Sequence, residues 1–234
     1  PSVMGSYLLM DGATGAPRTV LDGARLTLWR TAAASALAAR FLARRDAAQM
    51  LMVGAGALAP FLVRAHASLR PLADIAIWNR SPGRAGAVVA QLVSEGLPAR
   101  LAGALEDEVR AADLIACATL SKDPLVRGCW LKPGAHLDLV GAFNLAMREA
   151  DDDALRRCAV YVDTKAALTE GGDVAIGLRD GAIGPDAILG DLFDLCVRRC
   201  PGRRADDEIT LFKSVGTAIE DLAAADLVVR RLSA

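Results

Sequence analysis

The 234-residue sequence is poor in the residues that mark metal centres and disulfide frameworks. It contains only two histidines and five cysteines, and no two cysteines have the Cys-x-x-Cys spacing. We therefore expect no metal site, and the unpaired cysteines favour a reducing, cytoplasmic location. The net charge of −1 gives no electrostatic attraction to nucleic acid or to an anionic membrane, so neither is expected as a partner.

Aromatic residues and long apolar runs are also scarce. Aromatic side chains make up 4% of the chain, although 53% of its residues are apolar. The uncharged stretch 47–63 contains Gly54, Gly56 and Pro60, which is typical of a strand, a turn and a helix rather than of a membrane span. The first five residues have neither the basic region nor the apolar run of a signal peptide. The composition indicates an ordinary globular enzyme of one large or two small domains.

Residues 51–59 (LMVGAGALA) have the pattern of a phosphate-binding turn in a dinucleotide fold. Gly54 permits a tight turn after a strand, and Gly56 lets the backbone approach a pyrophosphate. Ala59 lets the following helix, over about 57–69, pack close to the sheet, with its N-terminus toward the phosphates. The alternative is a Gly/Ala-rich turn that binds no ligand. The turn residues expected to contact a cofactor are Gly54, Gly56, Ala57, Leu58 and Ala59.

The end of the next expected strand, residues 74–78, bears on which cofactor is bound. NAD-preferring folds usually place Asp or Glu there, where it accepts a hydrogen bond from the ribose 2′-hydroxyl. This chain has Asn79, Arg80 and Ser81 instead, with Arg84 one turn later. A guanidinium can hold a 2′-phosphate that a carboxylate would repel. We therefore expect NADP(H), against the alternative that Arg80 is an ordinary solvated loop residue.

Strand-like and helix-like segments alternate along most of the chain, which predicts a Rossmann-type, doubly wound parallel α/β sheet. The expected strands are 6–10, 18–21, 49–53, 74–78, 99–101, 113–118, 135–140 and 159–163. The expected helices are 23–45 (capped by Asp22), 57–69, 82–95, a short one opened by 106–108, 149–157 and 209–232. Because no strand follows the last helix, we expect it to pack on the N-terminal part. This predicts a dinucleotide-binding domain over 46–205 and a smaller α+β substrate and dimerisation portion formed by 1–45 and 206–234.

Short motifs in a fixed order connect these segments to a known family. Residues 29–36 (WRTAAASA) are similar to an Arg-Thr-Ala-Ala-x-Ser-Ala signature. Further matches are GAP at 15–17, the glycine turn, WNRS at 78–81, ATLS at 118–121, KPGAH at 132–136, RE at 148–149, EGGD at 170–173, FKSVG at 212–216 and ED at 220–221. Together they resemble the ornithine cyclodeaminase and mu-crystallin family. The WNRS motif is most similar to the NADPH-binding ketimine reductases of that family.

The resemblance implies roles for residues outside the glycine turn. Arg30 would clamp a substrate carboxylate beside the nicotinamide, because its paired donors orient carboxylates well. Without the resemblance, Arg30 would be a surface residue of an Ala-rich helix. Asp173 is expected to be a turn residue. Further cofactor contacts are implied for Thr31, Ala118, Thr119, Leu120, Ser121, Val140, Ser214 and Val215.

Two departures from the family pattern bear on the reaction. Family members normally have a segment ahead of the hairpin, with strands for dimer formation and a lysine near the substrate. The printed sequence begins after that position, so either it is incomplete or part of the usual site is lacking. None of the lysines of this chain matches the position of the family's substrate-site lysine; these lysines are Lys122, Lys132, Lys165 and Lys213. Cyclodeaminases also carry a catalytic Asp after the glycine that ends the strand at 135–140, where this chain has Ala142 after Gly141, which argues against cyclodeamination.

These observations predict an NADP(H)-dependent oxidoreductase. It would reduce the C=N bond of a cyclic ketimine carboxylate, such as pyrroline-2-carboxylate or piperideine-2-carboxylate, to a cyclic amino acid. The expected partners are this small carboxylate substrate and a second copy of the chain in a homodimer. Three alternatives stay open: an ornithine cyclodeaminase, an amino-acid dehydrogenase acting on a linear 2-oxo acid and ammonia, and an NADPH-binding protein without enzymatic activity.

Overall fold

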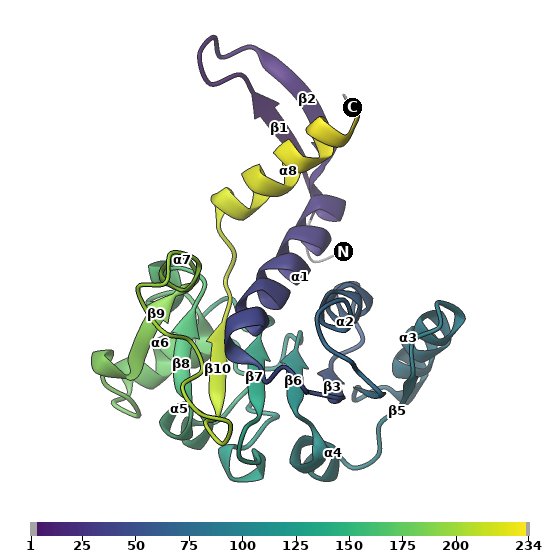
Figure 1. The fold of residues 1–234 in the computed structure, drawn as a ribbon, viewed down its shortest axis with the longest axis vertical. Coiled ribbons are helices and arrows are strands. Elements are labelled where there is room, and N and C mark those ends of the chain that lie inside the picture. The colour runs from purple at the N-terminus through teal and green to yellow at the C-terminus, as the bar shows by residue number, and fades with distance from the viewer. Residues whose placement is uncertain (1–3, 233–234) are drawn as a thin grey trace.

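The structure is a computed structural model that describes residues 4–232. A parallel sheet forms its body, and an N-terminal hairpin stands away from the sheet at the end of a long helix (Figure 1). The sheet has eight strands in the order β5-β4-β3-β6-β7-β10-β8-β9, each parallel to its neighbours. Its strands are β3 (Gln49–Val53), β4 (Asp74–Trp78), β5 (Ala99–Leu101), β6 (Leu114–Cys117), β7 (His136–Leu139), β8 (Ala159–Val162), β9 (Ile188–Asp191) and β10 (Thr210–Lys213).

Helices cover both faces of this sheet, which confirms the predicted doubly wound α/β class. Along β3, Leu51 and Val53 join a core with residues of α4, α5 and α6. The alternate residues Met50 and Met52 join a second core with residues of α1, α2 and α3. Burial on both faces explains why the strand is a continuous apolar run. The helices are α1 (Gly23–Leu42), α2 (Ala59–Ala67), α3 (Pro82–Ser94), α4 (Leu105–Ala111), α5 (Asp152–Arg157), α6 (Gly172–Arg179), α7 (Leu192–Cys196) and α8 (Ala218–Leu232).

The N-terminal hairpin joins β1 (Ser6–Met10) to β2 (Pro17–Asp22) in antiparallel register and leads directly into α1. Asp22 caps α1 as predicted, because its side chain accepts a hydrogen bond from Arg25 N at 3.0 Å. At the other end, the Arg70 guanidinium donates to the carbonyl oxygens of Ala39 and Ala43. Ala39 O also accepts from Ala43 N, whereas Arg70 supplies a partner for Ala43 O at the C-cap, where a helix leaves carbonyl groups without intrahelical partners. The helix α1 therefore ends at Leu42, three residues before the predicted end at residue 45.

The segment after residue 208 differs most from the sequence prediction. It was expected to be mostly helical, but its first part is the strand β10, which lies between β7 and β8. Leu211 and Phe212 are both fully buried, on opposite faces of the sheet. The helix α8 begins only at Ala218, after Gly216 adopts a positive φ of 87°. As expected, α8 packs on α1. The division of the chain into a dinucleotide-binding domain (46–205) and a second portion (1–45 and 206–234) stays a prediction. Part of 206–234 forms β10, a strand inside the sheet of the first domain.

Smaller differences concern the neighbouring segments. β9 was not predicted, and α5 begins at Asp152, so Glu149 lies in the loop before it. The residue expected to lie in a turn, Asp173, is instead a buried residue in the first turn of α6. Among residues 4–232, no helix combines the length and apolarity needed to cross a membrane.

Candidate cofactor and substrate site

The glycine turn after β3 leaves backbone donors open. Gly54 has a φ of 113°, and a Cβ atom there would lie 2.6 Å from Ala118 O, so glycine is required at this position. A Cβ at Gly56 would meet nothing within 4 Å. Within residues 4–232, the N–H groups of Gly56, Ala57 and Leu58 donate to no acceptor, and no side chain caps α2. Open N–H groups at a helix start favour an anion such as a pyrophosphate.

The loop after β4 places its cations at the start of α3. The Asn79 side chain donates to Ser81 O at 3.1 Å, which holds the loop in a tight turn. Ser81 is the N-cap residue of α3, but its side chain makes no capping hydrogen bond. Arg80 and Arg84 are exposed, and neither forms an ion pair with any residue that the structure describes. These two guanidiniums and the uncapped helix start suit a phosphate group.

The loops after β6 and β7 lie next to each other. Thr119 N and Oγ1 donate to Glu149 at 2.6 and 2.8 Å. Ser121 is buried, and its hydroxyl donates to Asp123 O at 2.7 Å, whereas Leu120 is exposed. Val140 follows β7, is 7% exposed, and packs in the core with α1 and α2. The Ser121 hydroxyl is therefore used within the protein. The polar groups that these two loops offer to a ligand are the backbone and Thr119.

The bend after β10 is fixed by a carboxylate that the sequence analysis did not single out. Asp163 directly follows β8, and its Oδ2 atom accepts from Ser214 Oγ, Val215 N and Gly216 N at 3.0, 2.7 and 2.6 Å. Its Oδ1 atom accepts from Thr164 N at 2.7 Å. The only sequence signal was the position of Asp163 at the carboxyl end of an expected strand.

Arg30 lies over this bend and is mostly buried. A Cβ at Gly216 would lie 2.9 Å from Arg30 Nη2, so the absence of a side chain there lets the guanidinium reach the bend. The Nη1 atom donates to Glu220 Oε2 at 3.0 Å, and the Nε atom lies 3.0 Å from Asp221 Oδ1. The side chain is 14% exposed, so Arg30 is not an ordinary surface residue of an Ala-rich helix. Thr31, the next residue, is also buried.

Two carboxylates on Arg30 were not expected from the sequence. Glu220 and Asp221 both come from the first turn of α8, which packs on α1. The pKa of Glu220 is raised to about 7, chiefly by burial and also by Asp163 and Asp221, against the lowering effect of Arg30. Next to this group, a cavity of about 580 Å³ lies between α1 and α8, lined mostly by apolar side chains such as Trp29 and Leu227.

Apart from Arg30 and Thr31, which lie on α1, the predicted site residues form a row along one edge of the sheet. They follow the carboxyl ends of β4, β3, β6, β7 and β10, which are consecutive neighbours in the strand order. From β3 the chain proceeds outward to β4 and β5 and then returns to β6 on the other side. Open α/β sheets bind ligands at such a switch point, outside the carboxyl ends of their strands. Within residues 4–232, no group of three or more His, Cys, Asp or Glu side chains is placed to hold a metal ion.

Comparison with known proteins identifies the family. The sequence pattern of the ornithine cyclodeaminase/mu-crystallin family matches residues 1–234, the whole chain. The chain belongs to this family. This confirms the resemblance inferred from the ordered motifs.

One curated relative and two solved structures show which proteins this chain is similar to. Delta(1)-pyrroline-2-carboxylate reductase of Colwellia psychrerythraea is 36% identical over 236 residues, covering 100% of this chain and 75% of that protein. The structure of Thermococcus litoralis Delta(1)-pyrroline-2-carboxylate reductase in complex with NADH and L-proline has a TM-score of 0.94 and 33% identity, covering 97% of this chain and 71% of that one. An archaeal alanine dehydrogenase dimer with bound NAD has a TM-score of 0.92 and 28% identity, with the same coverage of 97% and 71%.

Proposed function

We propose that this protein is a nicotinamide-dependent reductase of cyclic ketimine carboxylates. The observation that carries the proposal is the position of Arg30, which lies over Gly216 beside the row of strand ends. The pyrroline-2-carboxylate reductases among its relatives act on a substrate of this kind. A bound nicotinamide cofactor would supply the hydride for the imine carbon.

The residues of the chain would bind and orient both ligands. The open N–H groups at Gly56, Ala57 and Leu58 would hold the pyrophosphate. Arg30 would hold the substrate carboxylate through Nη2, which donates no hydrogen bond within residues 4–232. Positioning of the imine carbon against the cofactor then supplies much of the rate enhancement. The imine nitrogen takes up a proton as the carbon takes the hydride, which gives a cyclic amino acid.

The proposed cofactor form is NADP(H). The two solved relatives carry NADH and NAD, so the proposal depends on the loop after β4. That loop carries Arg80, and the first turn of α3 carries Arg84; neither guanidinium forms an ion pair within residues 4–232. The loop has no carboxylate that could accept from a ribose 2′-hydroxyl. An exposed, unpaired guanidinium fits a 2′-phosphate.

The amino-acid dehydrogenase is the second candidate, because the archaeal alanine dehydrogenase has nearly the same fold. It would use the same carboxylate clamp and the same hydride transfer. A cyclodeaminase is less well supported, because Ala142 follows Gly141 at the end of β7, where a cyclodeaminase is expected to carry its catalytic Asp. We also propose a homodimer, supported by the dimeric relative and by exposed apolar side chains on the hairpin, such as Leu8 and Val20.

Absorbance of NADPH distinguishes these activities. We expect oxidation of NADPH with pyrroline-2-carboxylate or piperideine-2-carboxylate, and little with pyruvate plus ammonia. Oxidation only in the second mixture would identify the dehydrogenase, and ammonia release from ornithine would identify the cyclodeaminase. Binding of NADPH with none of these reactions would support a non-enzymatic role.

Arg30→Ala tests the clamp. We expect KM for the cyclic imine to rise at least about tenfold, because a mostly buried charge-assisted contact is lost. The dissociation constant for NADPH should stay within about twofold. Arg40→Ala is the matched control, since Arg40 is an exposed arginine at the opposite end of the same helix. An unchanged KM in Arg30→Ala would remove Arg30 from the mechanism.

A further inference from the structure

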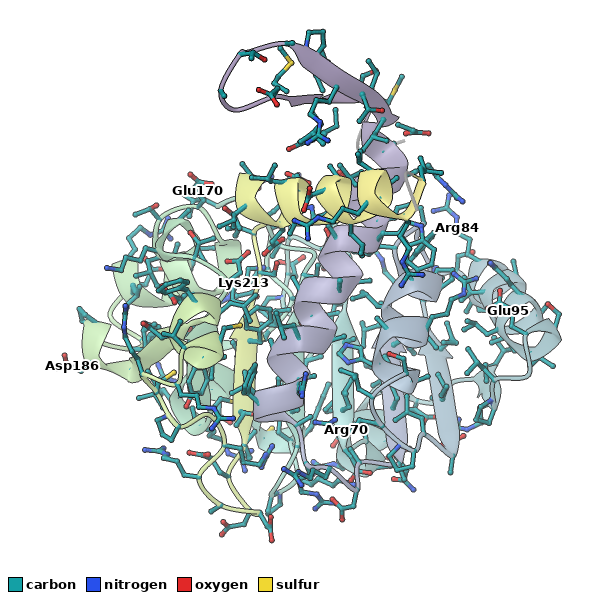
Figure 2. All side chains as sticks on the ribbon, turned by 45° about the horizontal axis from the view of Figure 1, so that its top comes forward. Arg70, Arg84, Glu95, Glu170, Asp186 and Lys213 are labelled. Carbon is teal, nitrogen blue, oxygen red and sulfur yellow. The ribbon has the colours of Figure 1, made fainter. Side chains whose placement is uncertain are left out.

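Three charged side chains are buried behind the row of strand ends. Glu149, Asp173 and Lys213 are each 0% exposed. They come from three different motifs of the sequence, RE, EGGD and FKSVG, and none of them was given a role in the site. Figure 2 shows Lys213 within the sheet, whereas Glu170, from the same motif as Asp173, lies at the surface. Burial of three charges costs several kcal/mol per ion unless each is well compensated, so their contacts are informative.

The first contacts join β10 to the loop before α5. Lys213 Nζ lies 3.3 Å from Asp173 Oδ2 in an ion pair without hydrogen-bond geometry. The other oxygen of Asp173 accepts from Glu149 N and Ala150 N at 2.7 and 2.9 Å. Asp173 therefore holds the backbone at Glu149 in place and faces Lys213 with its free oxygen.

The Glu149 side chain then joins two loops to each other. Its Oε1 atom accepts from Thr119 N and Thr119 Oγ1, after β6, at 2.6 and 2.8 Å. Its Oε2 atom accepts from Gly141 N and Ala142 N, after β7, at 2.7 and 3.2 Å. Each oxygen accepts from donors of a different loop, so one carboxylate sets the distance between the two loops.

Close packing leaves these loops little freedom to compensate. A Cβ atom at Gly141 would overlap the backbone of Thr119 and the Glu149 carboxylate. At Gly171, two residues before Asp173, a Cβ would lie 3.1 Å from Lys213 Cε. The pKa of Glu149 is raised to about 7, chiefly by burial and also by Asp173, against the lowering effect of Lys213 and of the hydrogen bonds from Thr119. The donors aimed at both oxygens favour the ionised form.

We propose that Glu149, Asp173 and Lys213 are positioning residues that fix the shape of the loops after β6 and β7 for the nicotinamide half of the cofactor. This inference rests on the proposed function, because it assumes a dinucleotide across the switch point. The adenosine half would lie at the glycine turn and Arg80, on the β3 and β4 side. The loops that Glu149 joins lie on the other side, so the cluster would act on one half of the ligand only.

Glu149→Gln is the decisive variant, because it keeps the size of the side chain. The NH₂ group of the glutamine would replace one acceptor oxygen and would face backbone N–H donors. The hydrogen bonds from residue 149 to one of the two loops would then be lost. We expect NADPH to bind at least about tenfold more weakly and kcat to fall at least about tenfold. Binding of adenosine 2′,5′-bisphosphate, which lacks the nicotinamide half, should change by less than about twofold. Lys213→Met and Asp173→Asn should show the same selective loss.

Glu170→Gln is the matched control, because it makes the same change at an exposed position close by. The proposal is overturned if Glu149→Gln binds NADPH and turns over like this control. It is also overturned if Glu149→Gln loses NADPH and the bisphosphate equally, since that indicates a general structural role. The comparison of the two ligands needs no substrate, so it stands even if the wild-type protein reduces no imine. Failure of the wild type to bind NADPH or NADH would instead contradict the proposed function.

Discussion

At the scale of single residues, Arg80 decides the proposed choice between cofactors. Its guanidinium is exposed and unpaired within residues 4–232, so a 2′-phosphate would meet no competing carboxylate. Arg80→Ala should weaken NADPH binding by about 1.5–3 kcal/mol, roughly tenfold to a hundredfold, because a charge-assisted contact is lost. NADH binding should change by less than about twofold. Fluorescence titration with both cofactors measures the difference, and equal losses would refute the 2′-phosphate contact.

Residues such as Gly54 and Arg80 could be found from the sequence because their chemistry is local. The role of a glycine in a tight turn or of an arginine after a strand depends on the neighbouring residues and not on distant segments of the chain. Asp163 and Glu149 could not be found in this way. Asp163 acts on the bend at residues 214–216, and Glu149 on Thr119, across separations of about 30 to 50 residues. The sequence places Glu149 in a motif and Asp163 at the end of a strand, but it does not show which backbone donors these carboxylates meet.

At the scale of elements, α8 brings Glu220 to the arginine of α1. Burial raises the pKa of this carboxyl from its ordinary 4.5 to about 7. Below pH 7 Glu220 is mainly neutral and holds Arg30 weakly, and above pH 7 it is ionised and competes with the substrate carboxylate. We therefore expect KM for the cyclic imine to rise several-fold between pH 6 and pH 8, with kcat changing less.

Glu220→Gln separates this effect from ionisation of the imine itself. The amide does not titrate, so the variant should lose the component of the KM profile centred near pH 7. Ionisation of the substrate would remain in both profiles. Steady-state kinetics of both proteins over pH 5.5 to 8.5 make the comparison. Superimposable profiles would show that Glu220 does not govern access to Arg30.

The elements themselves were mostly predictable, and β10 shows where prediction ends. Its apolar run is short and is followed by a helical pattern, so periodicity alone favours one long helix. What makes it a strand is the gap between β7 and β8, with which it pairs over Thr210 to Lys213. That gap is formed by segments about 50 and 70 residues earlier in the chain, which no local pattern reveals.

At the scale of the whole molecule, the hairpin stands away from the sheet (Figure 1), and it carries exposed apolar side chains. Leu8 and Val20 are cross-strand partners, and they are 54% and 64% exposed. Paired residues of a hairpin lie on the same face, so their side chains form one patch. An exposed apolar patch is a suitable contact surface for a two-fold dimer, in which the same patch of each subunit meets its copy.

Sedimentation velocity tests this assignment. The wild-type protein should sediment as a dimer, and Val20→Asp should shift it toward the monomer, because a buried unpaired carboxylate is costly. Leu101→Asp is the matched control: Leu101 is 51% exposed on the edge strand β5, far along the sheet from the hairpin. If Val20→Asp and Leu101→Asp sediment alike as dimers, the hairpin is not the contact surface. A wild-type monomer at all concentrations would exclude the homodimer altogether.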